Sequence, residues 1–508
     1  MKSKEESFLL SLRDVCFSYR YKPVLKNISF EIKAGEQWVC LGRNGAGKSS
    51  LAAILAGRNT GYSGTYSLTP TLEERGIQIV SFEEARDLRS RERKLDISEF
   101  NENAFDPGTT VRDLLRSIEI DPEESLRWIT IIGIKHILDR GIRFISTGEM
   151  RKVLLAKAIL KKPGLIILDN LMDGLDVVSQ KSMRALLEDL IDEKWCLLVL
   201  CRQPEDVPKK STHILILEKG VLLKKGERNL ILSDIDVTNL MRKPALRFDR
   251  LPSTLNRKVL PPMTGPLLSL ANVSVRYGEV QVLKDINWEF KSGQHCHIYG
   301  PNGCGKTTLL SLILGDNQKA YGQNIRIFGK LRGSGESIWD IKERFGQVGT
   351  ELQLDFVRKM KTLEVVVSGF FDTIGLYTNH NDYQKRHALE WLKIFQIQQF
   401  KNTAFDDLSF GIQRMILIIR AMVKSPAILV LDEPTAALDP ETESSLVKAI
   451  NESENNITII IAHRLSTIRH ADRILFLEEG EIVEEGKHED LMELSEGRYQ
   501  RFVHLASS

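Results

Sequence analysis

The sequence lacks long apolar runs, paired cysteines and an excess of charge of one sign. Its apolar stretches, such as residues 195–201, are far shorter than the ~20 residues that a bilayer-spanning helix needs. The N-terminal ten residues are charged and show neither the apolar core nor the small-residue cleavage site of a signal peptide. We therefore expect a cytoplasmic protein with no membrane span of its own.

The 70 Lys and Arg residues nearly balance the 68 Asp and Glu residues, which leaves a net charge of +2. Such a balance provides no general positive field for nucleic acid or acidic lipid, so any charged site must be local. The six cysteines form no CxxC pair and are expected to be reduced thiols in the core. A chain of 508 residues is long enough for several domains, at about 100–200 residues each.

An internal repeat organises the chain. The sequence GRNGAGKSS at 42–50 recurs as GPNGCGKTT at 300–308, and LIILDN at 165–170 recurs as ILVLDE at 428–433. The nearly constant offset predicts two copies of one domain, which we expect at 8–235 and 267–504. The residues between them, 236–266, are rich in proline and basic residues and are predicted to be an extended linker.

Each copy has the pattern of an α/β fold with a mainly parallel sheet. Alternating strand patterns at 8–41 and 267–299 precede a Gly-rich turn and a helix. Two further apolar strands follow in each copy, at 165–169 and 195–201 and at 428–432 and 457–462. Apolar strands alternating with helices favour a parallel sheet that is covered on both faces.

Both Gly-rich turns match the GxxxxGK[ST] pattern in its required context, between a strand and a helix. Glycines let successive backbone N–H groups face phosphates, and the helix N-terminus adds a partial positive charge. The predicted ATP-binding residues are Gly42, Asn44, Gly45, Gly47, Lys48, Ser49 and Ser50 in the first copy and Gly300, Asn302, Gly303, Gly305, Lys306, Thr307 and Thr308 in the second. Ser49 with Asp169, and Thr307 with Asp432, are predicted to hold Mg²⁺.

The copies differ where hydrolysis needs a base. Glu433 follows the metal-binding Asp432, and His463 ends the next strand, so both are predicted to be catalytic, with Glu433 as the base. The first copy has Asn170 and Arg202 at these positions. Because an amide cannot accept the proton, the first site is expected to bind ATP and to turn it over poorly.

These motifs resemble the nucleotide-binding domains of ABC ATPases over nearly the whole chain. The resemblance implies two P-loop NTPase domains in tandem, each with a mainly parallel sheet core, an antiparallel β part and a helical subdomain. In that family a segment of the LSGGQ type closes over the nucleotide of the opposite domain. The matches here are ISTGE at 145–149 and LSFGI at 408–412, which keep Ser146, Gly148, Ser409 and Gly411. Tyr19 and Tyr277 occupy the place of the adenine-stacking aromatic residue, although each could equally be a core residue.

The resemblance further implies a monomer whose two domains form a head-to-tail sandwich around two ATP molecules. The bulky residues Phe410 and Ile412 would then share one composite site with Asn170 and Arg202. All of the serious departures from the family pattern fall in that site. We therefore expect an asymmetric ATPase with one hydrolysing site and one that mainly holds ATP.

A narrower resemblance lies at 328–342, FGKLRGSGESIWDIK. This segment is similar to the family of the molybdate-transport ATP-binding protein ModF, also named photorepair protein PhrA, which carries two ABC domains on one chain. The residues alone indicate a surface turn that leads into a helix at 338–342. Nothing in their chemistry identifies molybdate.

The resemblance implies a peripheral energy subunit of an importer, for molybdate or another anion, bound to integral-membrane permease subunits at the inner face of the membrane. Glu83 and Thr350 are matched with the Gln that usually begins the membrane-contacting loop of such subunits. The alternatives are a soluble ABC-F-like protein that acts on the ribosome or nucleic acid, and an ATP-gated clamp that does not hydrolyse. The short proline-rich linker differs from the long helical linker of ABC-F proteins, and no specific nucleic acid is predicted.

Overall fold

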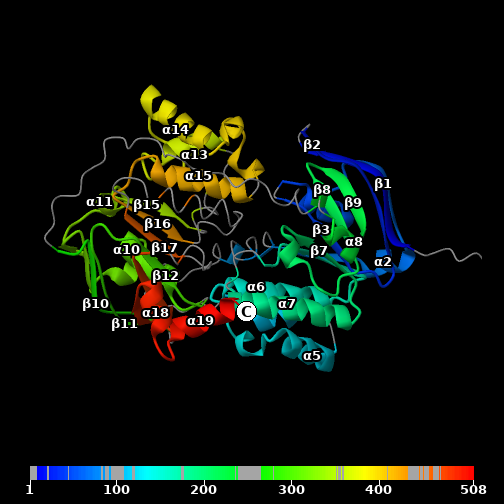
Figure 1. Cartoon of the computed structure of the whole chain (residues 1–508), viewed down its shortest axis with the longest axis horizontal. Coiled ribbons are helices and arrows are strands. Elements are labelled where there is room, and N and C mark those ends of the chain that lie inside the picture. The colour runs from blue at the N-terminus through cyan, green and yellow to red at the C-terminus, as the bar shows by residue number, and fades with distance from the viewer. Residues whose placement is uncertain are drawn as a thin grey trace, which may run out of the picture. The chain divides into compact units, whose positions relative to one another are not determined.

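The computed structural model in Figure 1 describes most of the chain. The described residues are 8–19, 22–43, 45–81, 84–85, 88, 91–92, 108–116, 121–172, 175, 177–234, 236–237, 265–277, 280–301, 303–349, 352, 356, 360–408, 410–432, 446, 450, 457–461, 468 and 471–507. Several predicted site residues lie outside these ranges: Asn44, Glu83, Asn302, Thr350, Ser409, Glu433 and His463. Most of the predicted linker also lies outside them.

The chain divides into two units. Unit 1 comprises Met1–Leu175 and Ser179–Lys243, and unit 2 comprises Asp176–Val178 and Pro244–Ser508. Each unit has one six-stranded sheet and one smaller antiparallel sheet, with strands in the same relative order.

In unit 1 the large sheet has the order β5-β6-β7-β3-β8-β9, in which only β9 is antiparallel to its neighbour. The small sheet has the order β2-β1-β4. The strands are β1 Phe8–Tyr19, β2 Lys22–Lys33, β3 Trp38–Leu41, β4 Tyr62–Leu68, β5 Ile77–Ser81, β6 Leu165–Asp169, β7 Leu197–Cys201, β8 His213–Glu218 and β9 Val221–Glu227. The helices are α1 Lys48–Leu55, α2 Pro70–Arg75, α4 Val111–Arg116, α5 Pro122–Ile132, α6 Thr147–Leu160, α7 Val177–Asp192 and α8 Arg228–Leu232.

Unit 2 repeats this plan with the orders β15-β16-β17-β12-β18-β19 and β11-β10-β13-β14. The strands are β10 Leu268–Tyr277, β11 Val280–Phe290, β12 Cys296–Tyr299, β13 Asn324–Ile327, β14 Lys330–Leu331, β15 Phe345–Val348, β16 Ile428–Asp432, β17 Ile457–Ile461, β18 Arg473–Glu478 and β19 Glu481–Gly486. The helices are α10 Lys306–Leu314, α11 Ile338–Lys342, α13 Thr362–Ser368, α14 Asp382–Ile394, α15 Phe410–Met422, α18 His488–Glu493 and α19 Arg498–Ser507. Figure 1 shows α13, α14 and α15 as one group beside β15 and β16.

The central strands are buried on both faces, which explains their continuous apolar sequences. Along β6, Leu165 and Ile167 pack toward α1 and the small sheet, whereas Ile166 and Leu168 pack toward the helices on the other face. Along β16 the residues alternate between two cores in the same way. The predicted strands at 165–169 and 428–432 are confirmed at both ends.

The segment at 328–342 forms β14, a turn and α11. The helix begins at Ile338, with Ser337 as its N-cap, as the sequence predicts. The turn is not a simple surface turn, because Arg332 is only 4% exposed and donates to Glu336 at 2.8 Å. The backbone N–H of Gly333 donates to the same carboxylate at 2.7 Å. Burial would raise the pKa of Glu336, but these bonds lower it to about 2.

All six cysteines are free thiols, four of them buried. The helices in the described ranges are all too short or too polar to cross a lipid bilayer.

Candidate functional site

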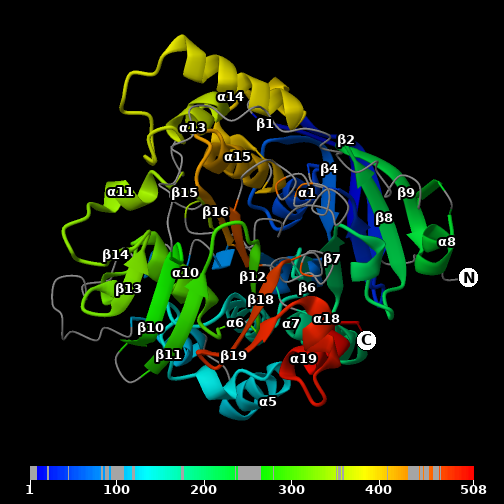
Figure 2. The ribbon, with the colours of Figure 1, turned by 60° about the vertical axis from the view of Figure 1, so that its left-hand side comes forward.

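The two Gly-rich loops have nearly the same backbone conformation. Gly47 and Gly305, which precede α1 and α10, both have φ of 102°, a left-handed value that favours glycine. Space also requires glycine at the start of each loop, because a Cβ on Gly42 would lie 2.4 Å from the Leu217 carbonyl oxygen. On Gly300 it would lie 2.0 Å from that of Leu477. Figure 2 shows β12, which precedes the second loop, beside β18, the strand that contains Leu477.

Both loop lysines are buried and fold back over their own loops. Lys48 Nζ donates to the carbonyl oxygens of Gly42 at 2.5 Å and Arg43 at 3.1 Å. Lys306 Nζ donates to Gly300 at 2.9 Å and Pro301 at 2.7 Å. Each ammonium group therefore lies over the loop whose N–H groups would face a phosphate.

The predicted metal-binding oxygens meet in each unit. Ser49 Oγ donates to Asp169 Oδ2 at 2.6 Å, and Thr307 Oγ1 donates to Asp432 Oδ2 at 3.2 Å. Hydroxyl and carboxylate oxygens are the hard ligands that Mg²⁺ prefers. The residues present therefore fit a Mg²⁺ ion beside a phosphate chain.

The residue after the strand-ending aspartate is held tightly in unit 1. Asn170 has φ of +50° and donates from Nδ2 to Asp169 Oδ1 at 2.5 Å. Burial raises the pKa of Asp169, although Ser49 and the charges of Lys48 and Arg202 lower it. Arg202 is thus close enough for its guanidinium charge to act on Asp169.

The signature segments lie at the N-termini of long helices. Ser146 caps α6, because its Oγ accepts from the Glu149 N–H at 3.2 Å while Glu149 Oε2 accepts from the Ser146 N–H at 2.7 Å. Gly148 is buried in the first turn. In unit 2, Gly411 is buried near the start of α15, and Ile412 packs against the core of its own unit. The bulk of Ile412 is thus partly absorbed by that core.

Both predicted adenine-stacking tyrosines are at strand ends on the surface. Tyr19 is 50% exposed at the end of β1, and Tyr277 is 38% exposed at the end of β10. The Tyr277 hydroxyl accepts a hydrogen bond from Asn317 Nδ2 at 2.8 Å. The alternative that these tyrosines are core residues is therefore wrong.

The strand register corrects the match between Glu83 and Thr350. Ser81 lies opposite Asp169, whereas Val348 lies opposite Leu431, one residue before Asp432. Ser81 is therefore equivalent to Gly349, and Glu83 to residue 351 rather than 350. Residue 351 is also a glutamate, so both units carry a carboxylate where the family usually has Gln.

Sequence reasoning missed a pair of buried arginines, Arg151 and Arg414, each five residues after a signature serine. Arg151 Nη1 donates to the Leu171 carbonyl oxygen at 2.5 Å, and Arg414 Nη2 donates to that of Asp432. Both are 1% exposed. Arg151 ties its signature helix to the turn just after β6, and Arg414 ties its helix to the last residue of β16. Their equal spacing in both copies was the available signal.

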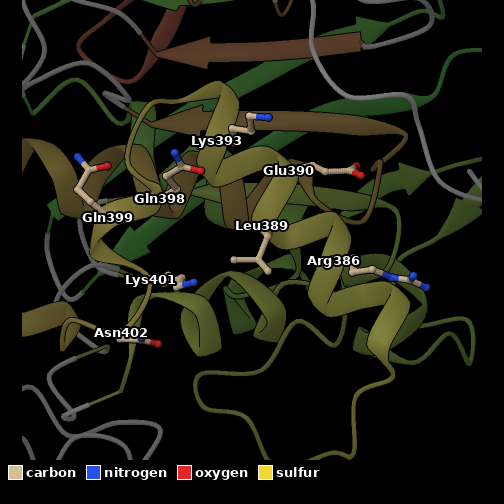
Figure 3. A pocket seen from close by; sticks show the side chains of 8 residues that line it. All are labelled: Arg386, Leu389, Glu390, Lys393, Gln398, Gln399, Lys401 and Asn402. Atoms are coloured by element: carbon tan, nitrogen blue, oxygen red, sulfur yellow. The ribbon is translucent and has the colours of Figure 1, made fainter.

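A separate open hollow of about 650 Å³ lies beside α14 in unit 2. Figure 3 shows Arg386, Glu390, Lys393 and Lys401 among its lining residues. None of the predicted ATP-binding residues lines it. It is therefore not the phosphate site.

Comparisons with known proteins agree with this geometry. The family model described as ABC transporter matches residues 25–172 and 283–436. The chain is 34% identical over 449 residues to the ABC transporter ATP-binding protein ModF of Escherichia coli (strain K12). This alignment covers 85% of this chain and 89% of the relative. It is 28% identical to an uncharacterized ABC transporter ATP-binding protein of Schizosaccharomyces pombe, over 87% of this chain and 92% of the relative.

A solved structure is similar in fold. It is the crystal structure of the complex of archaeal ribosomal stalk protein aP1 and archaeal ribosome recycling factor aABCE1, with a TM-score of 0.56 and 18% identity. The match covers 97% of this chain and 92% of that chain. At this identity the likeness shows the fold alone. Together with the matched motifs, the family model and the curated relatives show that the chain belongs to the ABC transporter ATP-binding family, as an ATPase with two ATP-binding domains in tandem.

Proposed function

We propose that this chain is an asymmetric ATPase that hydrolyses ATP at the Walker A loop of unit 2 and mainly holds ATP at that of unit 1. In this proposal Glu433 activates the attacking water, His463 lies near the γ-phosphate, and Mg²⁺ held by Thr307 and Asp432 stabilises the developing charge. The signature residue Ser146 faces the unit 2 nucleotide, and Ser409 faces the unit 1 nucleotide, in the head-to-tail arrangement that the family resemblance implies.

The observation that carries the asymmetry is the Asn170 side chain. Asn170 is at the sequence position of the base, but an amide cannot accept a proton from water as a carboxylate does. Its Nδ2 instead donates a hydrogen bond to Asp169. The equivalent residue in unit 2 is Glu433, a carboxylate. Loss of a general base costs ~10²–10⁴ in rate, which is enough to separate a hydrolysing site from a holding site.

The test is a matched pair of substitutions. Glu433→Gln should lower steady-state phosphate release by at least ~100-fold, whereas Asn170→Ala should change it by less than about twofold, because no base is lost. Equal losses from the two variants would overturn the proposal. Retention of ATP binding by Glu433→Gln, measured by equilibrium dialysis, controls for misfolding.

The proposed work of the ATPase is to energise an anion importer, with molybdate as the first candidate solute, from the cytoplasmic face of the membrane. Similarity to ModF, which is named an ABC transporter ATP-binding protein, supports this role. Detergent extraction followed by affinity purification should recover integral-membrane subunits with the chain. Co-sedimentation with ribosomes and no membrane partner would favour the soluble ABC-F-like role instead.

A further inference from the structure

Both carboxylate oxygens of Asp169 are already engaged within unit 1. Oδ2 accepts from Ser49 Oγ at 2.6 Å, and Oδ1 accepts from Asn170 Nδ2 at 2.5 Å. Asp169 is only 9% exposed. The carboxylate is therefore oriented by two side chains of the protein.

The backbone orients Asn170 for this contact. Its φ of +50° is a left-handed conformation that asparagine tolerates better than most residues, and its N–H donates to the Leu200 carbonyl oxygen at 3.2 Å. The amide cannot rotate by half a turn, because its own oxygen would then face a carboxylate oxygen and two acceptors would repel. In the described part of the chain, the Asn170 Oδ1 atom is buried and accepts no hydrogen bond. Such a buried acceptor is costly, so the bond to Asp169 must outweigh this cost.

Positive charges of the protein also act on the aspartate of unit 1. Lys48 and Arg202 both act electrostatically on Asp169. At the position of Arg202, unit 2 has His463. Thr307 and Asp432 are farther apart, at 3.2 Å. Glu433 cannot reproduce the amide clamp because an ionised carboxylate donates no hydrogen bond.

A divalent cation at a P-loop site neutralises phosphate charge and bridges it to the aspartate. In unit 1 the amide of Asn170 already satisfies one oxygen of that aspartate, and Arg202 balances its charge. We propose that Asn170 is a positioning residue that clamps Asp169, and that unit 1 consequently binds ATP without a divalent cation, whereas unit 2 requires Mg²⁺. This inference rests on the proposed function, because it explains how a non-hydrolysing site keeps its nucleotide.

The experiment uses the full-length chain with one loop disabled at a time. Lys306→Ala leaves unit 1 as the intact Walker A loop, and Lys48→Ala leaves unit 2. ATP affinity is measured by isothermal titration calorimetry in excess Mg²⁺ and in EDTA. For Lys306→Ala the dissociation constant should change by less than about threefold in EDTA, whereas for Lys48→Ala it should rise by more than about tenfold.

The clamp is tested by Asn170→Ala in the Lys306→Ala chain. The dissociation constant in EDTA should rise about tenfold, because one hydrogen bond to a charged group is lost, with little change in Mg²⁺. Arg202→His introduces the residue that unit 2 has at this position. It should also raise the ratio of the dissociation constant in EDTA to that in Mg²⁺. A merely structural role of Asn170 would lower affinity equally in both conditions.

The inference is overturned if ATP binding by the Lys306→Ala chain weakens by more than about threefold in EDTA, or if Asn170→Ala leaves the ratio of the dissociation constants in EDTA and in Mg²⁺ unchanged. Phosphate release by the same two single-loop variants in Mg²⁺ separates this result from the proposed function. A metal-dependent unit 1 that still does not hydrolyse ATP removes the clamp proposal alone. Equal hydrolysis by the two variants removes the asymmetry itself.

Discussion

Unit 1 and unit 2 share one topology and nearly the same P-loop backbone, yet they differ in the chemistry at the ends of two strands. The φ of the last loop glycine is 102° in both units. The residue after the strand-ending aspartate is an amide in unit 1 and a carboxylate in unit 2. Backbone geometry is thus sufficient to build a phosphate site, whereas the side chains at the strand ends determine what that site does with its phosphate.

The largest difference between the units should appear when each loop lysine is removed. Lys306→Ala should lower phosphate release by at least ~100-fold, because this lysine stabilises the phosphates at the hydrolysing site. Lys48→Ala should lower it by about tenfold or less, because only the held nucleotide is lost. Steady-state assays at saturating ATP and Mg²⁺ make the comparison. A larger loss from Lys48→Ala would reverse the assignment of the two sites.

Removal of either buried arginine should destabilise its own unit to a similar extent. Arg151→Ala and Arg414→Ala should each destabilise their own unit by about 2 kcal/mol, because a buried carbonyl oxygen loses a charged donor. Differential scanning calorimetry measures the shift of each transition. Lys152→Ala, whose exposed ammonium group donates to Ser182, is the control and should have an effect within about 0.5 kcal/mol. A shift from only one of the two arginines would show that the contacts are not equivalent.

The segment at 328–342, with its ion pair between Arg332 and Glu336, distinguishes unit 2 from unit 1. In unit 1 the chain between α1 and β5 forms β4 and the short α2. The pKa of Glu336 is lowered to about 2, so the folded state favours its charged form. Its stabilisation is therefore complete above the ordinary pKa of about 4.5 and is lost as the pH falls from there toward 2. Glu336→Gln should cost about 1.5 kcal/mol at pH 6.

Urea unfolding at pH 6 and at pH 3.5 tests this prediction, with the exposed Glu493→Gln as the control. The difference between the wild-type chain and Glu336→Gln should shrink at the lower pH. A difference that does not depend on pH would mean that packing, rather than the charge, accounts for the loss.

The surface tyrosines should produce the smallest effects. Tyr19→Ala and Tyr277→Ala should each weaken ATP binding at their own unit by about fivefold, if the adenine stacks on the ring. Tyr→Phe at both positions should leave affinity nearly unchanged, although Tyr277→Phe also removes the hydrogen bond with Asn317. Titration with ATP and with inorganic triphosphate separates adenine stacking from phosphate binding, because only ATP carries the adenine.

The strands and loops could be predicted from sequence because their causes are local. A strand that is buried on both faces is a continuous apolar run, and β6 and β16 end where an aspartate interrupts that run. Glycines with positive φ mark the P-loops in the same direct way. The duplication then confirms each pattern a second time within one chain.

Contacts that depend on tertiary geometry could not be predicted in this way. The Asn170 clamp requires a left-handed backbone that the sequence does not reveal. The match of Glu83 was wrong by one residue because no periodic pattern marks the end of β5, and only the pairing of Ser81 with Asp169 aligns it. The side chains of Arg332 and Glu336 are buried beside the pair of β13 and β14, in a segment whose composition resembles an exposed turn.

The asymmetry itself is tested most directly by the nucleotide that remains bound after turnover. The full-length chain is incubated with ATP and Mg²⁺, freed of unbound nucleotide by rapid gel filtration, denatured and analysed by chromatography. We expect about one intact ATP per chain, retained by the loop of Lys48, while the site of Lys306 has formed ADP and phosphate. Conversion of all bound nucleotide to ADP, with equal rates at both sites, would contradict it.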